Sequence, residues 1–141
     1  MASIRFFTES TNFKISSPRK TRAWIRAVAK IEKRAISEIN YIFCSDTYLL
    51  ELNQRFLKHN TLTDIITFDN TEEGKDINGE IYISIDRVKE NSKNLGTLFQ
   101  EELHRVIFHG ALHLCGFKDK TRQQKVIMRN KEEQNLDAYF K

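Results

Sequence analysis

The sequence predicts an α+β fold in which about five helices pack on one small four-stranded sheet. The chain has 141 residues, and 40% of them are hydrophobic, which suits a single domain with one core. Strand-like and helix-like periodicities alternate in the first part of the chain, whereas the last third shows helical patterns only. We therefore expect one domain over residues 1–141.

Composition excludes several classes of protein. The longest wholly apolar stretches are about four residues long, far below the roughly 20 needed to span a bilayer, and the first residues do not form a secretion signal. We expect a soluble, cytoplasmic protein without a membrane partner. Cys44 and Cys115 lie far apart in no paired motif, which favours buried, reduced thiols over a disulfide.

The first predicted helix follows a strand over residues 4–7 and carries an apolar stripe. Ser17 followed by Pro18 is a typical helix start, and the helix should run to about residue 32. The apolar residues that share one stripe, and that we expect to face the core, are Trp24, Ala27, Val28 and Ile31.

The opposite face of this helix is basic. Residues 14–34 contain eight basic residues and one acidic residue. The bases that fall opposite the apolar stripe are Arg19, Arg22, Arg26, Lys30 and Lys33. Such a stripe is either a solvated helix face or a surface for an RNA backbone, and both interpretations stay open at this point.

Three more strands are predicted, over residues 39–44, 64–68 and 80–85. The first is followed by Ser45 and Asp46, either of which can cap a helix that ends near Lys58. The third is followed by Asp86, a predicted cap for a short helix.

The last part of the chain is predicted to be helical. Thr97 with Gln100 has the pattern of a capping box that opens a long helix over residues 98–114, and Thr121 with Gln124 repeats this pattern for a final helix. The long helix carries an apolar stripe that should be buried, formed by Phe99, Leu103, Val106, Ile107, Gly110 and Leu114.

The flank of the long helix carries a metal-binding pattern. His109 and His113 are four residues apart, so their Cβ atoms lie about 5 to 6 Å apart on one helix edge. Gly116 can adopt the left-handed conformation that ends the helix, and the returning chain then brings Asp119 toward the same point. Two imidazoles and one carboxylate leave a fourth position for water, as in catalytic zinc sites. We predict one divalent ion per chain, Zn²⁺, bound by His109, His113 and Asp119.

Other interpretations of this pattern have less support. Two histidines on a helix flank are often only buried and hydrogen-bonded, but a turn glycine and a carboxylate in register favour a metal site. Cys115 should point elsewhere on the helix, so we interpret it as a packing residue.

The same spacing of metal ligands occurs in metalloproteases, in which a glutamate after the first histidine is the general base. That position is Gly110 here, so peptide hydrolysis lacks its base. A phosphodiester needs cations for its charge, which the basic helix supplies if its stripe is an RNA surface.

The metal-binding string resembles that of a known family. The YbeY family of rRNA maturation endoribonucleases carries the pattern HGxLHLxGYDH, whose three histidines are metal ligands, and residues 109–119 resemble it as HGALHLCGFKD. Residues 52–68, LNQRFLKHNTLTDIITF, resemble the family segment that ends in TDVLSF. Residues 78–84, NGEIYIS, resemble its GDIxIS strand. The resemblance covers most of the chain, in the family's order.

Two positions depart from the family pattern. The family's third histidine is Asp119 here, which keeps a metal-binding side chain but adds a negative charge that should make the ion a weaker Lewis acid. An arginine of the middle segment, which the resemblance implies serves catalysis, is Leu57 here, and Lys58 or His59 would have to supply its charge. The general base stays unassigned.

The resemblance implies a small mixed sheet packed by helices, with the metal in a zincin-like cleft. It also implies a metal-dependent, single-strand-specific endoribonuclease that acts in 16S rRNA 3′-end maturation and ribosome quality control. Single-stranded ribosomal RNA and the small ribosomal subunit are then its partners. The residues that we predict to contact RNA are Arg19, Arg22, Arg26, Lys30, Lys58 and His59. Two alternatives stay open: a metalloprotease-like hydrolase, and a ribosome assembly factor whose metal is structural.

Overall fold

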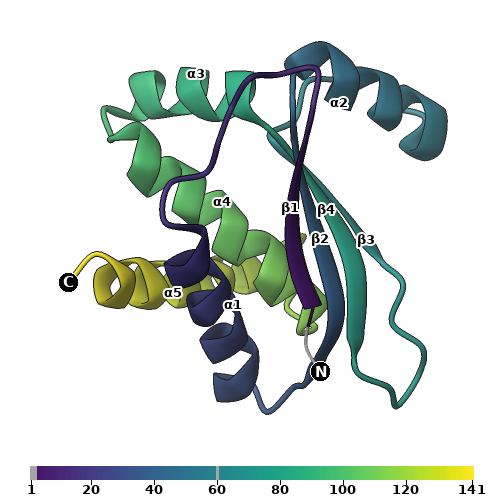
Figure 1. Ribbon diagram of the computed structural model, residues 1–141, viewed down its shortest axis with the longest axis vertical. Coiled ribbons are helices and arrows are strands. Elements are labelled where there is room, and N and C mark those ends of the chain that lie inside the picture. Colours follow the sequence, from purple (N-terminus) through teal and green to yellow (C-terminus); the bar gives the residue numbers. More distant parts are fainter. Residues whose placement is uncertain (1–2, 60) are drawn as a thin grey trace.

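The computed structural model describes residues 3–59 and 61–141 (Figure 1). In chain order the elements are β1 (Ser3–Glu9), α1 (Pro18–Ile31), β2 (Ile36–Cys44), α2 (Asp46–Leu52), η1 (Asn53–Leu57), β3 (Ile65–Asp69), β4 (Ile77–Ser84), α3 (Ile85–Leu95), α4 (Phe99–Leu114) and α5 (Arg122–Tyr139). Every predicted strand and helix is present, and η1 is a short π-helix that continues α2. Within the described ranges, no helix is long and apolar enough to cross a membrane.

The four strands form one mixed sheet in the order β1-β2-β4-β3. β1, β2 and β4 run parallel, and β3 pairs antiparallel with β4 at one edge. The predicted α+β fold with a mixed four-stranded sheet is thereby confirmed. β4 begins at Ile77, earlier than the predicted start at residue 80. The prediction began too late because Gly79 interrupts the strand-like pattern of the sequence. A Cβ at position 79 would lie 2.7 Å from Cδ2 of Leu114, so this glycine lets α4 approach the sheet.

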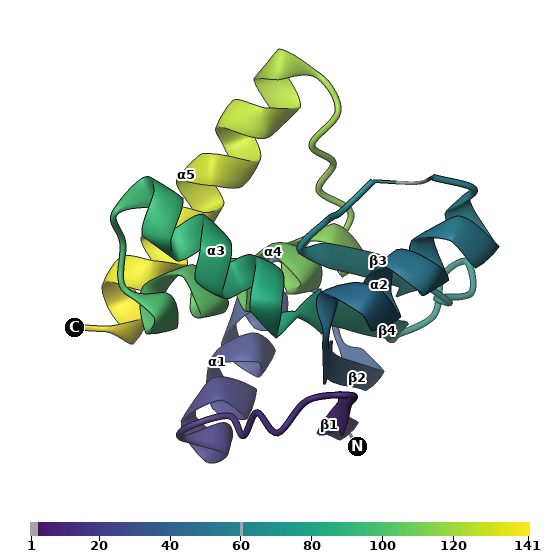
Figure 2. The same ribbon diagram turned by 90° about the horizontal axis from the view of Figure 1, so that it is seen from above.

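Helices cover both faces of the sheet, but unequally. α1 and α4 lie against one face, where Tyr41 and Phe43 are fully buried in the main core (Figure 1). α2 lies on the opposite face and covers one end of it, over a smaller cluster formed by Cys44, Leu49 and Ile66. α5 packs on α4 away from the sheet (Figure 2). α4 is therefore enclosed between the sheet and α5.

The predicted burial of α4 is confirmed for its apolar stripe, except that Phe99 is only half-buried. However, Glu102, His104 and Arg105 are buried as well. Their side chains lie outside the apolar stripe, and the sequence pattern alone places them toward solvent. They are buried because α3 and α5 pack on the sides of α4 that the sheet leaves uncovered.

Two predicted side-chain caps are confirmed. Ser45, one of the two candidates, caps α2 by accepting a hydrogen bond from a backbone N–H at 3.1 Å. Thr121 and Gln124 form a complete capping box at the start of α5.

Two other predicted caps are wrong. The Thr97 side chain does not cap α4, because its backbone belongs to the turn that ends α3, and its hydroxyl is buried without a hydrogen-bond partner among the described residues. α3 is capped by Ser84 rather than by Asp86. The Asp86 carboxylate instead accepts a hydrogen bond from the Asp46 backbone N–H at 2.9 Å, and so stabilises the start of α2.

α1 buries a different face from the one predicted. Its buried residues are Thr21, Ile25, Val28 and Ala29. Trp24 and Ala27 are half-buried, whereas Ile31 is 65% exposed, so its predicted burial is wrong. Both sets of residues have helical spacing, and packing against α4 and the sheet selects between them.

Candidate metal centre

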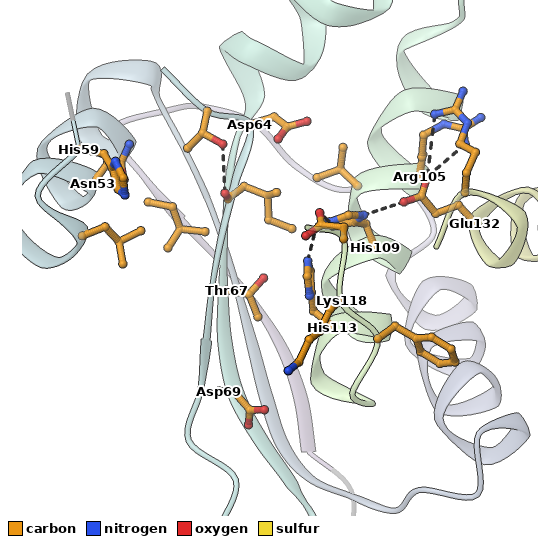
Figure 3. Close-up of a pocket in the computed structure, with 18 of the residues that line it drawn as sticks. Asn53, His59, Asp64, Thr67, Asp69, Arg105, His109, His113, Lys118 and Glu132 are labelled. Atoms are coloured by element: carbon orange, nitrogen blue, oxygen red, sulfur yellow. Dashed lines mark hydrogen bonds and ion pairs between the residues drawn. The ribbon is translucent and has the colours of Figure 1, made fainter. Parts of the chain in front are cut away.

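α4 places two imidazole rings next to each other at its C-terminal end (Figure 3). The ring centroids of His109 and His113, one helical turn apart, are separated by 4.6 Å. α4 ends in a turn in which Gly116, with a φ of 110°, donates a backbone hydrogen bond to the His113 carbonyl at 3.0 Å. This conformation favours glycine. The turn returns the chain so that Asp119 faces both histidines.

The three predicted ligands are close enough to share one ion. Oδ2 of Asp119 lies 3.2 Å from Nε2 of His109 and 3.4 Å from Nε2 of His113. Ligand atoms in a tetrahedral zinc site with bonds of about 2.0 to 2.1 Å are about 3.3 Å apart. The donor set and its spacing therefore fit Zn²⁺. Cys115 is a free thiol outside this group, as predicted.

A carboxylate that the sequence analysis missed supports His109. Nδ1 of His109 donates a hydrogen bond to Oε2 of Glu132 at 2.6 Å, which leaves Nε2 available for a metal. The Glu132 side chain, on α5, is only 7% exposed. It lies on the same buried stripe as Met128 and Leu136. An acid within an apolar helical stripe was the signal in the sequence that could have identified it.

Arg105 anchors Glu132 from α4. Its Nη1 lies 3.3 Å from Oε1 of Glu132, its Nη2 lies 2.5 Å from Oε1 of Glu133, and its Nε lies 3.6 Å from Oε1 of Glu102. The guanidinium is nearly buried, and these carboxylates compensate its charge. Glu132 thus bridges Arg105 and His109, and this bridge sets the orientation of the imidazole.

The two imidazoles differ in their pKa. Burial lowers the pKa of His109, but the hydrogen bond to Glu132 and the charges of Glu132 and Asp119 outweigh burial and raise it. Burial, and then the neighbouring His109, lower the pKa of His113. A ring must be unprotonated at Nε2 to bind a metal, so acid should compete with the metal first at His109.

Gly110 shows why this helix carries no protease-like base. A Cβ at this position would lie 2.9 Å from Cδ1 of Ile81 and 3.1 Å from Cδ1 of Ile65. Position 110 therefore faces the sheet where α4 approaches it closely. A glutamate there would collide with both isoleucines, so the fold itself counts against the metalloprotease alternative.

The candidate ligands line a cavity of about 910 Å³. Figure 3 shows Asp64, Thr67 and Asp69 on its β3 side, opposite the two histidines of α4. Burial raises the pKa of Asp64, although the nearby His109 opposes this effect. The Asp64 carboxylate makes no ion pair within the part of the chain that the structure describes. It is therefore available to a molecule in the cavity.

The residues predicted to bind RNA lie in two places. His59 lines the cavity, whereas the exposed Lys58 beside it does not. The bases of α1, all within the described ranges, do not line the cavity. Figure 2 shows α1 on the opposite side of α4 from the first turns of α5. The exposed ones are Arg19, Arg26 and Lys30. Arg22 is engaged within the fold, because its Nε donates a hydrogen bond to the Ile4 carbonyl at 2.9 Å and its guanidinium lies 5.1 Å from the centre of the Phe6 ring.

Comparison with known proteins agrees with the family resemblance. The family described as "Endoribonuclease YbeY" matches residues 5–140. A Cytophaga hutchinsonii protein named "Endoribonuclease YbeY" is 51% identical over 133 residues, which cover 94% of this chain and 93% of that protein. A Flavobacterium psychrophilum protein of the same name is 46% identical and covers 94% of each chain. The fold is similar to the solution structure of TM1509 from Thermotoga maritima, with a TM-score of 0.67 and 28% identity over 97% of this chain and 89% of that one.

Proposed function

Because this chain belongs to the YbeY family of endoribonucleases, we propose that it is a metal-dependent enzyme that cuts single-stranded ribosomal RNA. We propose that it acts in the cytoplasm on the small ribosomal subunit, in 16S rRNA 3′-end maturation and ribosome quality control. The observation that carries the metal dependence is the cluster of His109, His113 and Asp119 beside a large cavity.

The residues of this cluster would hold one ion, for which we propose Zn²⁺. When bound, the ion would act as a Lewis acid that polarises the scissile phosphate or activates its nucleophile. The surrounding residues orient the ligands. Arg105 holds Glu132, and Glu132 keeps His109 in the tautomer that presents Nε2 to the ion.

We propose Asp64 as the proton acceptor. The two buried glutamates that line the cavity, Glu102 and Glu132, both face Arg105. Asp64 has no such partner, and its raised pKa, caused mainly by burial, makes it a stronger base than an exposed aspartate. Its carboxylate would take the proton of the attacking oxygen, whether that oxygen belongs to water or to the ribose 2′-hydroxyl.

His59 is better placed than Lys58 to replace the arginine of the family. Leu57, which occupies the arginine position, lines the cavity together with His59, whereas Lys58 does not. On the other side of the cavity, Lys118 and Arg129 add positive charge. These cations would stabilise the negative charge of a phosphodiester during cleavage.

The two rival functions have weaker support. The close packing of Gly110 against the sheet counts against a metalloprotease. A ribosome assembly factor with a structural metal would need a closed site, whereas this ligand group borders an open cavity.

Metal analysis and an RNA-cleavage assay on the same preparations test this proposal. Wild type should contain about one zinc per chain and cut single-stranded ribosomal RNA but no peptide. His113→Ala should lose both the metal and the cleavage. His59→Ala, which alters the cavity but no ligand, should keep the metal. A wild-type protein that holds zinc but cuts no RNA would favour the assembly factor.

A further inference from the structure

The first third of α5 stands away from the rest of the molecule. Every side chain of residues 122–127 is exposed or half-buried, and the first buried side chain of α5 is that of Met128. Figure 2 shows this end of the helix projecting beyond α4. It is nevertheless helical, because the capping box of Thr121 and Gln124 satisfies its first backbone N–H groups.

This projecting end is strongly basic. Between residues 117 and 131 the only acid is Asp119, which belongs to the candidate metal centre. The exposed bases of this stretch are Lys118, Lys120, Arg122, Lys125 and Arg129. Only Arg129 forms ion pairs with acids that the structure describes, at 3.6 Å from Glu133 and 4.0 Å from Glu132. The other four bases therefore contribute no ion pair to the described fold.

These bases continue outward from the cavity. Lys118 and Arg129 line the cavity itself. With about 100° per residue, Arg122, Lys125 and Arg129 fall within about 60° of arc, so they share one face of α5. The helical rise places Arg122 about 10 Å from Arg129 along the axis. A row of positive charge thus runs from the rim of the cavity along α5.

We infer that the α5 basic face, formed by Arg122 and Lys125 on the helix and by Lys120 just before it, binds the backbone of the single-stranded RNA that extends out of the cavity. This inference rests on the proposed function and adds the surface that holds the substrate outside the metal centre. The charge of this face suits a polyanion, because each phosphate that a base neutralises releases bound counterions.

The α1 stripe is the competing surface for RNA. α4 separates it from the cavity, and Arg22 is already bound to the Ile4 carbonyl. A strand with one phosphate in the cavity meets the α5 basic face directly, whereas α4 stands between that phosphate and α1. We therefore expect α5 to contribute more to RNA affinity than α1.

The test compares three charge-reversal variants with the same change in formal charge. The first is Lys120→Glu/Arg122→Glu/Lys125→Glu at the start of α5. The second is Arg19→Glu/Arg26→Glu/Lys30→Glu on α1, which leaves Arg22 in place. The control is Lys75→Glu/Lys89→Glu/Lys93→Glu, which reverses exposed bases elsewhere. In the α5 variant the new glutamates lie near a helix N-terminus, where negative charge is favourable, so the helix should form.

Binding is measured with labelled, nuclease-resistant 2′-O-methyl RNA between about 50 and 200 mM salt. The α5 variant should bind at least about tenfold more weakly than wild type, and its slope of log K against log salt should flatten by about 2. Its metal content should equal that of wild type. The exchange Lys120→Arg/Arg122→Lys/Lys125→Arg should bind as wild type does.

Equal RNA affinity of wild type and the α5 variant would overturn the inference. A loss of RNA affinity in the control or in the α1 variant as large as that in the α5 variant would also overturn it. Cleavage is assayed separately. If wild type binds RNA through α5 but cuts none, the proposed function is refuted, whereas RNA binding by the α5 basic face is supported. If wild type cuts RNA while the α5 variant binds RNA normally, RNA binding by the α5 basic face is refuted but the proposed function is not.

Discussion

His109 on α4 and Glu132 on α5 are joined by a 2.6 Å hydrogen bond. Arg105, one helical turn before His109, binds the other oxygen of the same carboxylate at 3.3 Å. The orientation of a candidate metal ligand therefore depends on how α5 packs on α4. Metal binding and the docking of α5 should be energetically coupled for this reason.

Replacing Glu132 tests this coupling. Glu132→Gln should weaken zinc binding by about 10- to 100-fold, because the neutral amide orients and polarises His109 less strongly than the carboxylate. Competition with a chromophoric chelator measures the affinity. Glu133→Gln removes the other α5 charge beside Arg105 without touching His109, and should bind zinc as wild type does. Equal zinc affinities for the two variants would contradict the assigned role.

Asp119→His restores the third histidine of the family pattern. The variant should keep the metal, because imidazole is also a zinc ligand. It should cut RNA several-fold faster per bound metal, because loss of the carboxylate charge makes the ion a stronger Lewis acid. Single-turnover cleavage with parallel metal analysis measures both quantities. Slower cleavage at full metal occupancy would show that the carboxylate does more than bind the ion.

The role proposed for Asp64 predicts a selective loss. Asp64→Asn should reduce the cleavage rate by about 10²- to 10⁴-fold while metal content and RNA affinity stay unchanged. In wild type the rate should rise with pH as Asp64 loses its proton, at a pH above the usual range of an aspartate because its pKa is raised. Asp69→Asn, at a more exposed carboxylate of the same cavity, is the matched control. A pH profile unchanged in Asp64→Asn would rule out this assignment.

His104 predicts an acid-sensitive stability. Its Nδ1 lies 2.7 Å from the Gln100 carbonyl, and its Nε2 is buried without a partner among the described residues. Burial lowers its pKa below the ordinary 6.5, so at acid pH the unfolded chain binds a proton that the folded chain does not. The free energy of unfolding should therefore fall as the pH drops below 6.5, by up to about 1.4 kcal/mol per pH unit from this residue.

Urea unfolding at about pH 7.5 and about pH 5.5 measures this contribution. His104→Gln should lose less stability than wild type between the two conditions, because glutamine does not titrate. The difference between the two proteins isolates His104 from the other histidines. If wild type and His104→Gln lose the same free energy of unfolding between the two pH values, His104 does not cause the acid sensitivity.

Gly110→Ala tests the close packing of α4 on the sheet. Alanine favours a helix over glycine by about 1 kcal/mol, yet the variant should be less stable by about 1 to 3 kcal/mol because its Cβ meets Ile81. Adding Ile81→Val removes Cδ1 from the contact and should recover part of the loss. Chemical denaturation of Gly110→Ala, Ile81→Val and the double variant gives the coupling free energy between the two positions. A stabilised Gly110→Ala would show that the helix and sheet can separate without cost.

Local patterns predicted the elements well, and they failed where neighbouring segments compete for a residue. The capping box of Thr121 is confirmed because the start of α5 lies free of other elements. Thr97 has the same pattern, but the turn that ends α3 already uses its backbone. Ile31 has helical spacing with the apolar stripe of α1, but it lies in the last turn, where the described residues leave 65% of it exposed.

The sequence by itself determined the candidate metal-ligand group, because its members lie within residues 109–119 and their approach depends only on helical periodicity and a turn glycine. Only the tertiary structure decided that Glu132 supports His109 and that Asp64 faces the same cavity. These residues are far apart in the chain, and they meet because α5 packs on α4 and β3 forms the sheet edge. Such contacts arise from burial summed over the whole core, which no local spacing encodes.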